Sequence, residues 1–376
     1  MLHPRRLVAD AGDYLPRTPG TLPAGCYRYL PTRPRATVAT LRDELITLAH
    51  GAGGKATRAL VEGLFLAELS NLLLDELGDA AVGELGGARL AFTTDSYVVK
   101  PLFFPGGSIG ELAVNGTVND LAVAGAEPLW LSAAFVVEEG FPVADLRRIA
   151  SSMAEAARAA GVAVVAGDTK VVERGSADGL FVTTAGVGVV RPETDLGVDR
   201  ARPGDRILLS GTIGDHGFAV LVARGELKLE SPLESDSAAV NGLAAALCEL
   251  GPKLRWMRDP TRGGLATTLN ELAQGSGLTV RLDEEALPIR AEVAGAAEIL
   301  GIDPLYVANE GKIVAVVAPD AADEALAALR SQPLGREAVL VGEVCADEDA
   351  LVVLDTALGG SRIVDMLVGD PLPRIC

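Results

Sequence analysis

The sequence contains few of the side chains that build zinc centres or disulfide frameworks. It has three histidines and four cysteines in 376 residues, and aromatic residues make up only 4% of the chain. The histidines are residues 3, 50 and 216, and the cysteines are residues 26, 248, 345 and 376. Because they are widely scattered and form no CxxC pair, we expect neither a zinc site nor a set of disulfides. Unpaired cysteines indicate a reducing, cytoplasmic environment.

Long hydrophobic runs and an excess of basic charge are also absent. The longest apolar stretch, Pro128–Val137, has about ten residues, whereas a membrane helix needs roughly 20. Lys and Arg number 33 against 51 Asp and Glu, which gives a net charge of −18. A sequence-independent nucleic-acid binder needs a basic surface, so we expect neither a membrane nor a nucleic-acid partner. The acidic charge does not exclude phosphate ligands, because a divalent metal can neutralise phosphates and acidic side chains together.

Residues 1–40 differ in composition from the rest of the chain. Seven arginines against two aspartates give residues 1–42 a net charge of +5, which leaves −23 on the remainder, and residues 1–38 contain six prolines. Proline lacks the amide donor and fixes its own φ, so this stretch should be irregular. Its arginines also suit a transit peptide, but the prolines would break the amphipathic helix of such a peptide. We interpret 1–40 as an extension and expect the chain to function without 1–38.

The rest of the chain predicts two units of the α/β (or mixed α+β) class. Strand and helix periodicities alternate up to about residue 190, and a second alternating series follows the Pro/Gly break at 202–205. We place the domains at 41–195 and 196–345. Residues 346–376, which are rich in Gly and Pro near their end, predict an extended tail that carries a terminal cysteine.

A glycine-rich segment, His50-Gly-Ala-Gly-Gly-Lys55, precedes a predicted helix. Glycines let the backbone approach an anion, a helix N-terminus presents free amides, and lysine adds a positive charge. The spacing differs from that of the Walker A motif. From the residues alone, a phosphate-binding loop and a plain helix-capping turn are equally plausible.

Acidic residues stand inside apolar elements or at their ends. Asp95 lies in an apolar strand, Asn119 and Asp120 interrupt an apolar helix, Asp168 follows an apolar strand, and Asp259 opens a helix. A single buried acid can be a satisfied core residue. Four of them beside a glycine loop favour oxygen ligation of Mg²⁺ on a nucleotide.

Two further charged residues, Lys170 and Glu310, lie at predicted strand ends. Such a pair can transfer protons, although solvated loop charges are the simpler interpretation. His216 follows a glycine-spaced turn, and a packing role is favoured over catalysis for it.

The last residue, Cys376, ends a proline-stiffened tail, Pro-Leu-Pro-Arg-Ile-Cys. A terminal thiol on such a tail can move between sites, as a covalent carrier requires. The neighbouring α-carboxylate disfavours the thiolate, and Arg374 partly offsets this effect. The alternative is a frayed terminus that ends in cysteine by coincidence.

From about residue 46 to the end, the chain resembles the HypE family, the carbamoyl dehydratases of NiFe-hydrogenase maturation, within the PurM-like ATP-binding superfamily. The segments that carry the resemblance are HGAGGK at 50–55, TTDSYVV at 93–99, NGTVNDLAVAGAEP at 115–128, AGDTKVV at 166–172, SGTIGDHG at 210–217, DPTRGGLATTLNE at 259–271, NEGK at 309–312 and the terminal PRIC. Several would suit any member of the superfamily. The terminal Pro-Arg-Ile-Cys is the specific one.

The resemblance implies a chemistry and a set of site residues. A carbamoyl group on the thiol of Cys376 would be phosphorylated by ATP and would lose phosphate to leave a thiocyanate. The matching positions imply Mg²⁺–phosphate acids at Asp95, Asp120 and Asp259 and a proton-accepting pair at Lys170 and Glu310. The nucleotide-binding positions implied are Gly53, Gly54, Lys55, Asn119 and Asp168.

The resemblance also implies an assembly. In the family fold, two α/β domains make up the subunit, and the N-terminal domains of a homodimer pair into a shared β-barrel. The implied partners are the carbamoyltransferase HypF and the HypC–HypD iron scaffold. The sequence departs from the family in its 1–40 extension.

Two other classes of function compete with this one. Selenophosphate synthetases, thiamine-phosphate kinases and aminoimidazole-ribotide synthetases share the superfamily, but none needs a terminal cysteine. A non-catalytic thiol carrier or scaffold would need the cysteine without the acids. The acids are present, and they argue against it.

Overall fold

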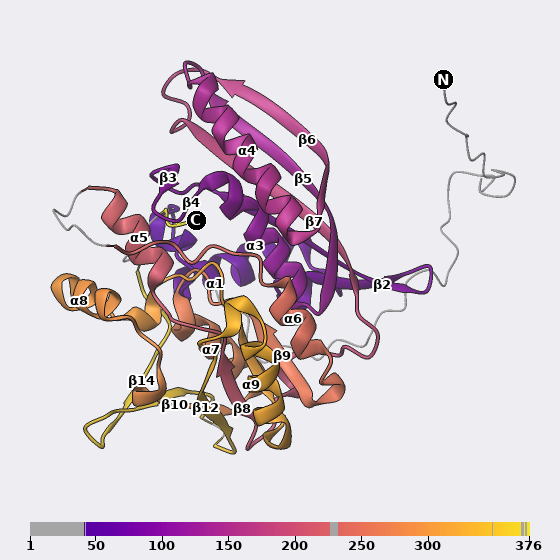
Figure 1. Cartoon of the computed structure of the whole chain (residues 1–376), viewed down its shortest axis with the longest axis vertical. Helices are drawn as coiled ribbons and strands as arrows, with labels where there is room; N and C mark the ends of the chain where they lie inside the picture. The colour runs from indigo at the N-terminus through magenta and orange to yellow at the C-terminus, as the bar shows by residue number, and fades with distance from the viewer. Residues whose placement is uncertain (1–40, 42, 226–231, 348, 370–371, 373) are drawn as a thin grey trace, which may run out of the picture.

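The computed structural model describes residues 41, 43–225, 232–347, 349–369, 372 and 374–376 (Figure 1). The predicted extension, 1–40, lies outside the described residues. The described residues contain two large sheets, each with its own helices, and one two-stranded ribbon. No helix in this part of the chain is both long enough and apolar enough to cross a bilayer.

The first unit contains a five-stranded sheet in the order β1-β2-β7-β5-β6. Its strands and helices are β1 (Ala81–Leu85), β2 (Ala88–Tyr97), β5 (Ala126–Glu138), β6 (Ala163–Val172), β7 (Leu180–Val190), α3 (Ile109–Val123) and α4 (Val143–Ala160). A small ribbon of β3 (Phe103–Phe104) and β4 (Gly107–Ser108) precedes α3. Neighbours pair antiparallel except β5 and β6, which are parallel and joined by the crossover helix α4, as parallel strands require.

Helix α3 lies at the centre of the molecule, between this sheet and the second unit. Every residue of α3 except Glu111 and Asp120 is buried. This explains why its sequence is apolar on all sides rather than amphipathic. Asp120 is therefore an acid held at one partly open point of an otherwise buried helix.

The second unit contains a seven-stranded sheet in the order β14-β13-β10-β12-β8-β11-β9. Its strands are β8 (Arg206–Leu209), β9 (Leu254–Arg258), β10 (Thr279–Asp283), β11 (Val314–Val317), β12 (Val339–Cys345), β13 (Val352–Asp355) and β14 (Ser361–Ile363). Its helices are α5 (Asp215–Ala223), α6 (Asn241–Cys248), α7 (Gly264–Ser276), α8 (Ala291–Leu300) and α9 (Ala322–Arg330). Alternate residues of β11 enter separate apolar clusters on the two faces, so both faces of the sheet are covered.

Ahead of the first sheet, a helical segment connects α1 (Lys55–Leu60) and α2 (Leu66–Leu69) through one wide turn, Val61–Phe65. The two units share one core, because residues of α3 and residues of α5, such as Phe218, belong to the same buried cluster. In Figure 1 the chain end, marked C, lies beside α5 and the β3–β4 ribbon, near the junction of the units.

Two predicted boundaries differ from the structure. The strand predicted to stop before Asp168 continues as β6 to Val172, so Asp168 lies within an edge strand rather than after its end. The predicted tail, 346–376, is not extended throughout, because β13 and β14 join the second sheet through β10. The part without regular structure begins after Ile363.

Candidate active site

A pocket of about 230 Å³ lies where β2, α3, the loop before α7 and the chain terminus meet. The polar character of its wall is set by acids, hydroxyls and one guanidinium. Its lining residues are Asp79, Thr93, Thr94, Asp95, Ser96, Tyr97, Gly116, Asp120, Asp259, Thr261, Arg262, Glu310 and Cys376. Five of the predicted site residues, Asp95, Asp120, Asp259, Glu310 and Cys376, therefore share one cavity, although they are far apart in the sequence.

Three carboxylates in the pocket form a compact oxygen cluster. One oxygen each of Asp79, Asp120 and Asp259 lies within 4.8 Å of the others. Arg258 donates from Nε to both oxygens of Asp79 at 2.8 Å, and Thr93 donates to Asp120 Oδ2 at 2.7 Å. Asp259 Oδ2 is buried without a hydrogen-bond partner among the described residues. The three acids are thus held in place with oxygen atoms left over, which fits a divalent cation.

Burial and the repulsion between neighbouring carboxylates favour the protonated forms of Asp120, Asp259 and Glu310. Burial raises the pKa of Asp120, Asp259 and Glu310 well above the ordinary values, and neighbouring carboxylates raise each pKa further. The pKa of Asp95 is also raised, chiefly by burial, although Arg262 opposes the shift. A divalent cation bound to the cluster would favour the ionised forms of these acids.

Asp79 and Tyr97 are pocket residues that the sequence analysis missed. Asp79 lies two residues before β1, a strand that the sequence did not predict, and nothing in its local sequence signals a place in a pocket. The Tyr97 side chain is almost fully buried and its hydroxyl donates to Asp95 Oδ2 at 3.1 Å. The spacing of two residues places Asp95 and Tyr97 on the same face of a strand, which is a signal that could have found the tyrosine.

The terminal cysteine is docked against the segment that follows β2. The backbone N–H of Val98 donates to the terminal carbonyl oxygen of Cys376 at 3.0 Å, and the N–H of Lys100 donates to the Arg374 carbonyl at 3.2 Å. Negative charge at Cys376 is the main cause that raises the pKa of Arg262. The thiol-bearing residue therefore lies at the pocket wall together with a guanidinium.

Comparison with known proteins agrees with this geometry. The chain matches the family models "AIR synthase related protein, N-terminal domain" at residues 77–190 and "AIR synthase related protein, C-terminal domain" at residues 202–355. It is 55% identical to a carbamoyl dehydratase HypE of Azotobacter vinelandii over 336 residues, which are 89% of this chain and 98% of that protein. The chain belongs to the HypE family.

Solved HypE structures have the same fold. The HypE chain of a HypE–HypF complex is 50% identical, with a TM-score of 0.78, and the match covers 82% of this chain and 100% of that one. A HypE in complex with ATP is 47% identical, with a TM-score of 0.74, over 88% of this chain and 99% of that one. The predicted PurM-like fold and the predicted family are confirmed, and the competing superfamily enzymes are set aside.

The glycine loop predicted for phosphate lies against the tail rather than in the acidic pocket. A Cβ on Gly53, where φ is +80°, would lie 2.7 Å from the Arg262 carbonyl oxygen. A Cβ on Gly54 would collide with the carbonyl of Leu367, which accepts from the Lys55 N–H at 2.9 Å. Close backbone packing therefore accounts for these glycines by itself. Their predicted contact with a nucleotide stays a prediction.

Three other predicted positions, Asn119, Asp168 and Lys170, lie outside the pocket. The Asn119 carboxamide is fully buried, donates to the carbonyls of Ala238 and Glu310 at 3.1 Å, and accepts from the Val240 N–H at 2.8 Å. Asn119 thus fixes the backbone of Glu310, a structural task that does not need a nucleotide.

Lys170 and Asp168 lie on the exposed edge strand β6, the third strand from β2 across the sheet. Lys170 Nζ and Asp168 Oδ2 form an ion pair at 2.8 Å, and the hydrogen bond from Lys170 lowers the pKa of Asp168. Both carboxylate and ammonium are exposed. Within one subunit these two residues are not brought to Glu310 or Cys376, so their roles also remain predictions.

Proposed function

We propose that this carbamoyl dehydratase removes the elements of water from a carboxamide carried on the thiol of Cys376. In this reaction the amide oxygen attacks the γ-phosphorus of ATP, and ADP leaves. The nitrogen then gives up two protons and the carbon–oxygen bond breaks, so that phosphate departs and a cyano group remains on sulfur. The S-cyanide is the source of cyanide ligands for the iron of a NiFe-hydrogenase. Family membership and the position of Cys376 at the acidic pocket support this proposal.

The pocket residues have two proposed tasks, which are to bind a metal ion and to accept a proton. Asp79, Asp120 and Asp259 would hold Mg²⁺, which when bound offsets the charge of the transferring phosphate. Asp95, which was predicted as a Mg²⁺–phosphate acid, lines the same pocket but does not belong to this oxygen cluster, and its role there stays a prediction. Glu310 is buried, and its Oε1 has no hydrogen-bond partner among the described residues. Once a bound cation favours its ionised form, a carboxylate with an open oxygen in the same pocket as Cys376 is suited to take a proton from the carboxamide nitrogen.

We assign Gly53, Gly54 and Lys55 to the ATP site because their loop borders a second cavity. This cavity, of about 150 Å³, is lined by Gly51, Ala52, Arg262 and Cys376 among others, so it adjoins the acidic pocket at two shared residues. A nucleotide that spans both cavities would bring its phosphates to the acid cluster. Asn119 and Asp168 are retained in this assignment by their match to the family motifs.

Lys170 is proposed to act only in a homodimer. Strand β6 exposes its free edge together with the apolar side chains of Val164, Val165 and Val171, and such an edge favours pairing with another strand. A second subunit on this edge would form the shared β-barrel of the family and place Lys170 in the interface. The proposed partners are HypF, as supplier of the carbamoyl group, and a HypC–HypD complex, as acceptor of the cyanide, in the cytoplasm.

The mass of the intact chain tests the proposal. After carbamoylation by its transferase, addition of MgATP should remove one water, about 18 Da, from the modified chain, and peptide mapping should place the change on Cys376. A Cys376→Ala chain should accept no carbamoyl group. An adduct that persists unchanged with MgATP would contradict the dehydratase function.

A further inference from the structure

His216, which the sequence analysis favoured as a packing residue, contacts the reactive tail. It is fully buried near the start of α5. Its Nε2 lies 3.0 Å from the carbonyl oxygen of Ile375, the residue directly before Cys376. Its Nδ1 lies 2.7 Å from Ser235 Oγ. Both ring nitrogens are therefore used, one of them on the tail.

The partners of the ring define its tautomer. A carbonyl oxygen only accepts, so the proton must be on Nε2, and Nδ1 then accepts from the Ser235 hydroxyl. Ser235 Oγ in turn accepts from the Ser237 N–H at 3.0 Å, which orients the hydroxyl. Burial lowers the pKa of His216 and favours the neutral ring. The Phe104 ring packs edge-on against it at 5.6 Å between centroids. The imidazole is thus a rigid single donor aimed at Ile375.

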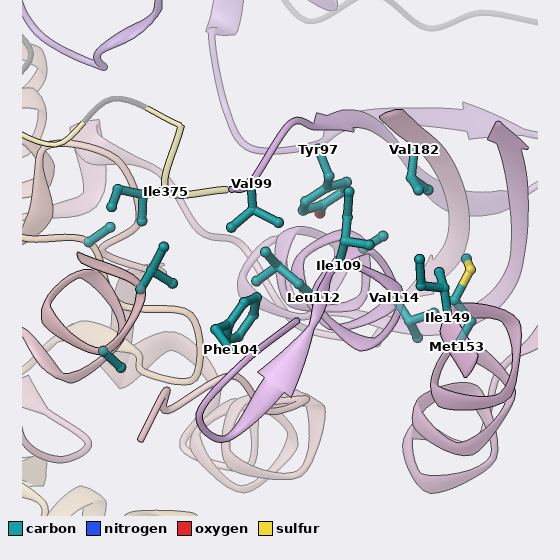
Figure 2. Packing of buried hydrophobic residues seen from close by; sticks show 14 of the residues in the cluster. Tyr97, Val99, Phe104, Ile109, Leu112, Val114, Ile149, Met153, Val182 and Ile375 are labelled. Carbon is teal, nitrogen blue, oxygen red and sulfur yellow. The ribbon is translucent and has the colours of Figure 1, made fainter. Parts of the chain in front are cut away.

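The other contacts of the tail hold Arg374 and the side chain of Ile375, but not the Ile375 carbonyl that His216 binds. The Arg374 carbonyl accepts from Lys100 N–H and from Arg224 Nη2, the latter at 2.8 Å. The Ile375 side chain is buried and lies near Val99 in the core cluster shown in Figure 2. His216 fixes the peptide between these anchors and the thiol, and the direction of that peptide determines where the side chain of Cys376 points.

We propose that His216 is a positioning residue for the reaction, which holds the Ile375 carbonyl so that the group on Cys376 stays in the acidic pocket. This inference rests on the proposed function. Replacing His216 would leave the Ile375 carbonyl without this donor in a buried place. Losses of that kind shift a local equilibrium by roughly tenfold, so the tail should leave the pocket about ten times more often.

Two substitutions and one control separate positioning from folding. His216→Ala removes the donor, and His216→Gln places an amide N–H near the position of Nε2. The control is Asn270→Ala, because Asn270 is similarly buried and donates to another carbonyl of the chain end, that of Val364, at 2.8 Å. All chains would be carbamoylated to completion first and then mixed with excess MgATP in a single turnover. The alkylation rate of the free Cys376 thiol would be measured by peptide mapping on separate chains that have not been carbamoylated, and Kd for MgATP by calorimetry.

We expect His216→Ala to slow the single-turnover dehydration about tenfold and to speed alkylation of Cys376 by a similar factor, with Kd for MgATP unchanged. His216→Gln should recover most of both rates, and Asn270→Ala should change neither. Equal dehydration and alkylation rates in wild type and His216→Ala would overturn the inference. A merely structural role would show as equal losses in the alanine and glutamine variants or as weaker binding of MgATP. A wild-type chain that does not dehydrate would contradict the proposed function itself.

Discussion

The self-repulsion of the acid cluster makes a prediction for the Asp259→Asn variant. Two full charges 4.8 Å apart repel by about 3.5 kcal/mol at an effective dielectric constant of about 20. Asp259 has two such neighbours, Asp79 and Asp120, and the substitution removes both repulsions while it conserves shape. Two effects already relieve part of these repulsions in the wild type. The raised pKa values favour protonated Asp120 and Asp259, and the Arg258 guanidinium offsets the charge of Asp79. We therefore expect the metal-free variant to be more stable than wild type by about 1–2 kcal/mol at pH 8.

The pH dependence of this difference follows from the direction of the pKa shifts. Burial, with help from neighbouring acids, raises the pKa of Asp120 and Asp259 in the folded protein. An acid whose folded pKa is raised stabilises the fold fully below its unfolded pKa, and this contribution is lost as the pH rises through the folded pKa. The wild type should therefore lose more stability than Asp259→Asn between about pH 5 and pH 8, so the gap between them should widen with pH.

Urea unfolding at several pH values, in EDTA and then in excess Mg²⁺, measures both effects. Mg²⁺ bound at the proposed site of the folded protein should stabilise the wild type more than the variant and reverse their order at pH 8. Asp323→Asn, an exposed acid on α9, is the control and should follow the wild type throughout. The reasoning is refuted if Asp259→Asn is the less stable protein in EDTA at pH 8, or if Mg²⁺ stabilises both equally.

Two more predictions concern proton transfer and assembly. Glu310→Gln should bind MgATP as the wild type does but dehydrate the carbamoylated chain at least about 100-fold more slowly, because loss of a general base costs that much; unchanged rates in a time course of intact mass would remove Glu310 from the mechanism. Val165→Glu should convert the proposed dimer to monomers, since Val165 is 59% exposed on the edge strand β6 and the interface would bury the new charge. Light scattering that finds the same mass for both chains would place the interface elsewhere.

The sequence identified acids that stand out against apolar neighbours. Asp95, Asp120 and Asp259 lie in or beside buried elements, where a carboxylate is costly unless it serves a purpose. Asp79 escaped because its position depends on tertiary contacts: β1 pairs with β2, and Arg258 reaches across from β9 to hold it. Local pattern alone does not report such an arrangement.

Asp79 is a pocket residue that the sequence did not predict, whereas Lys170 is a predicted site residue that lies outside the pocket. The apolar residues of the strand that carries Lys170 predict burial, and the predicted strand end would aim Asp168 and Lys170 at a site. In the structure the strand is longer and lies at the sheet edge, with its apolar side chains exposed. An apolar edge strand of this kind has the sequence of a buried one, and the difference depends on what covers it. The same pattern is correct for the assembly if the proposed dimer covers β6.

The tail and the acids are positioned by the same short segment. Tyr97 donates to Asp95, and the next residue, Val98, donates to the terminal carboxylate of Cys376. Because these two residues are covalently adjacent, a displacement of the end of β2 moves an acid and the thiol together. Small motions of this segment therefore leave the group on sulfur in the same place relative to the pocket. That placement changes when the hydrogen bonds from Val98 to Cys376 and from His216 to Ile375 break. Under the proposed function, we expect those bonds to determine how long the carried group stays in reach of the acids.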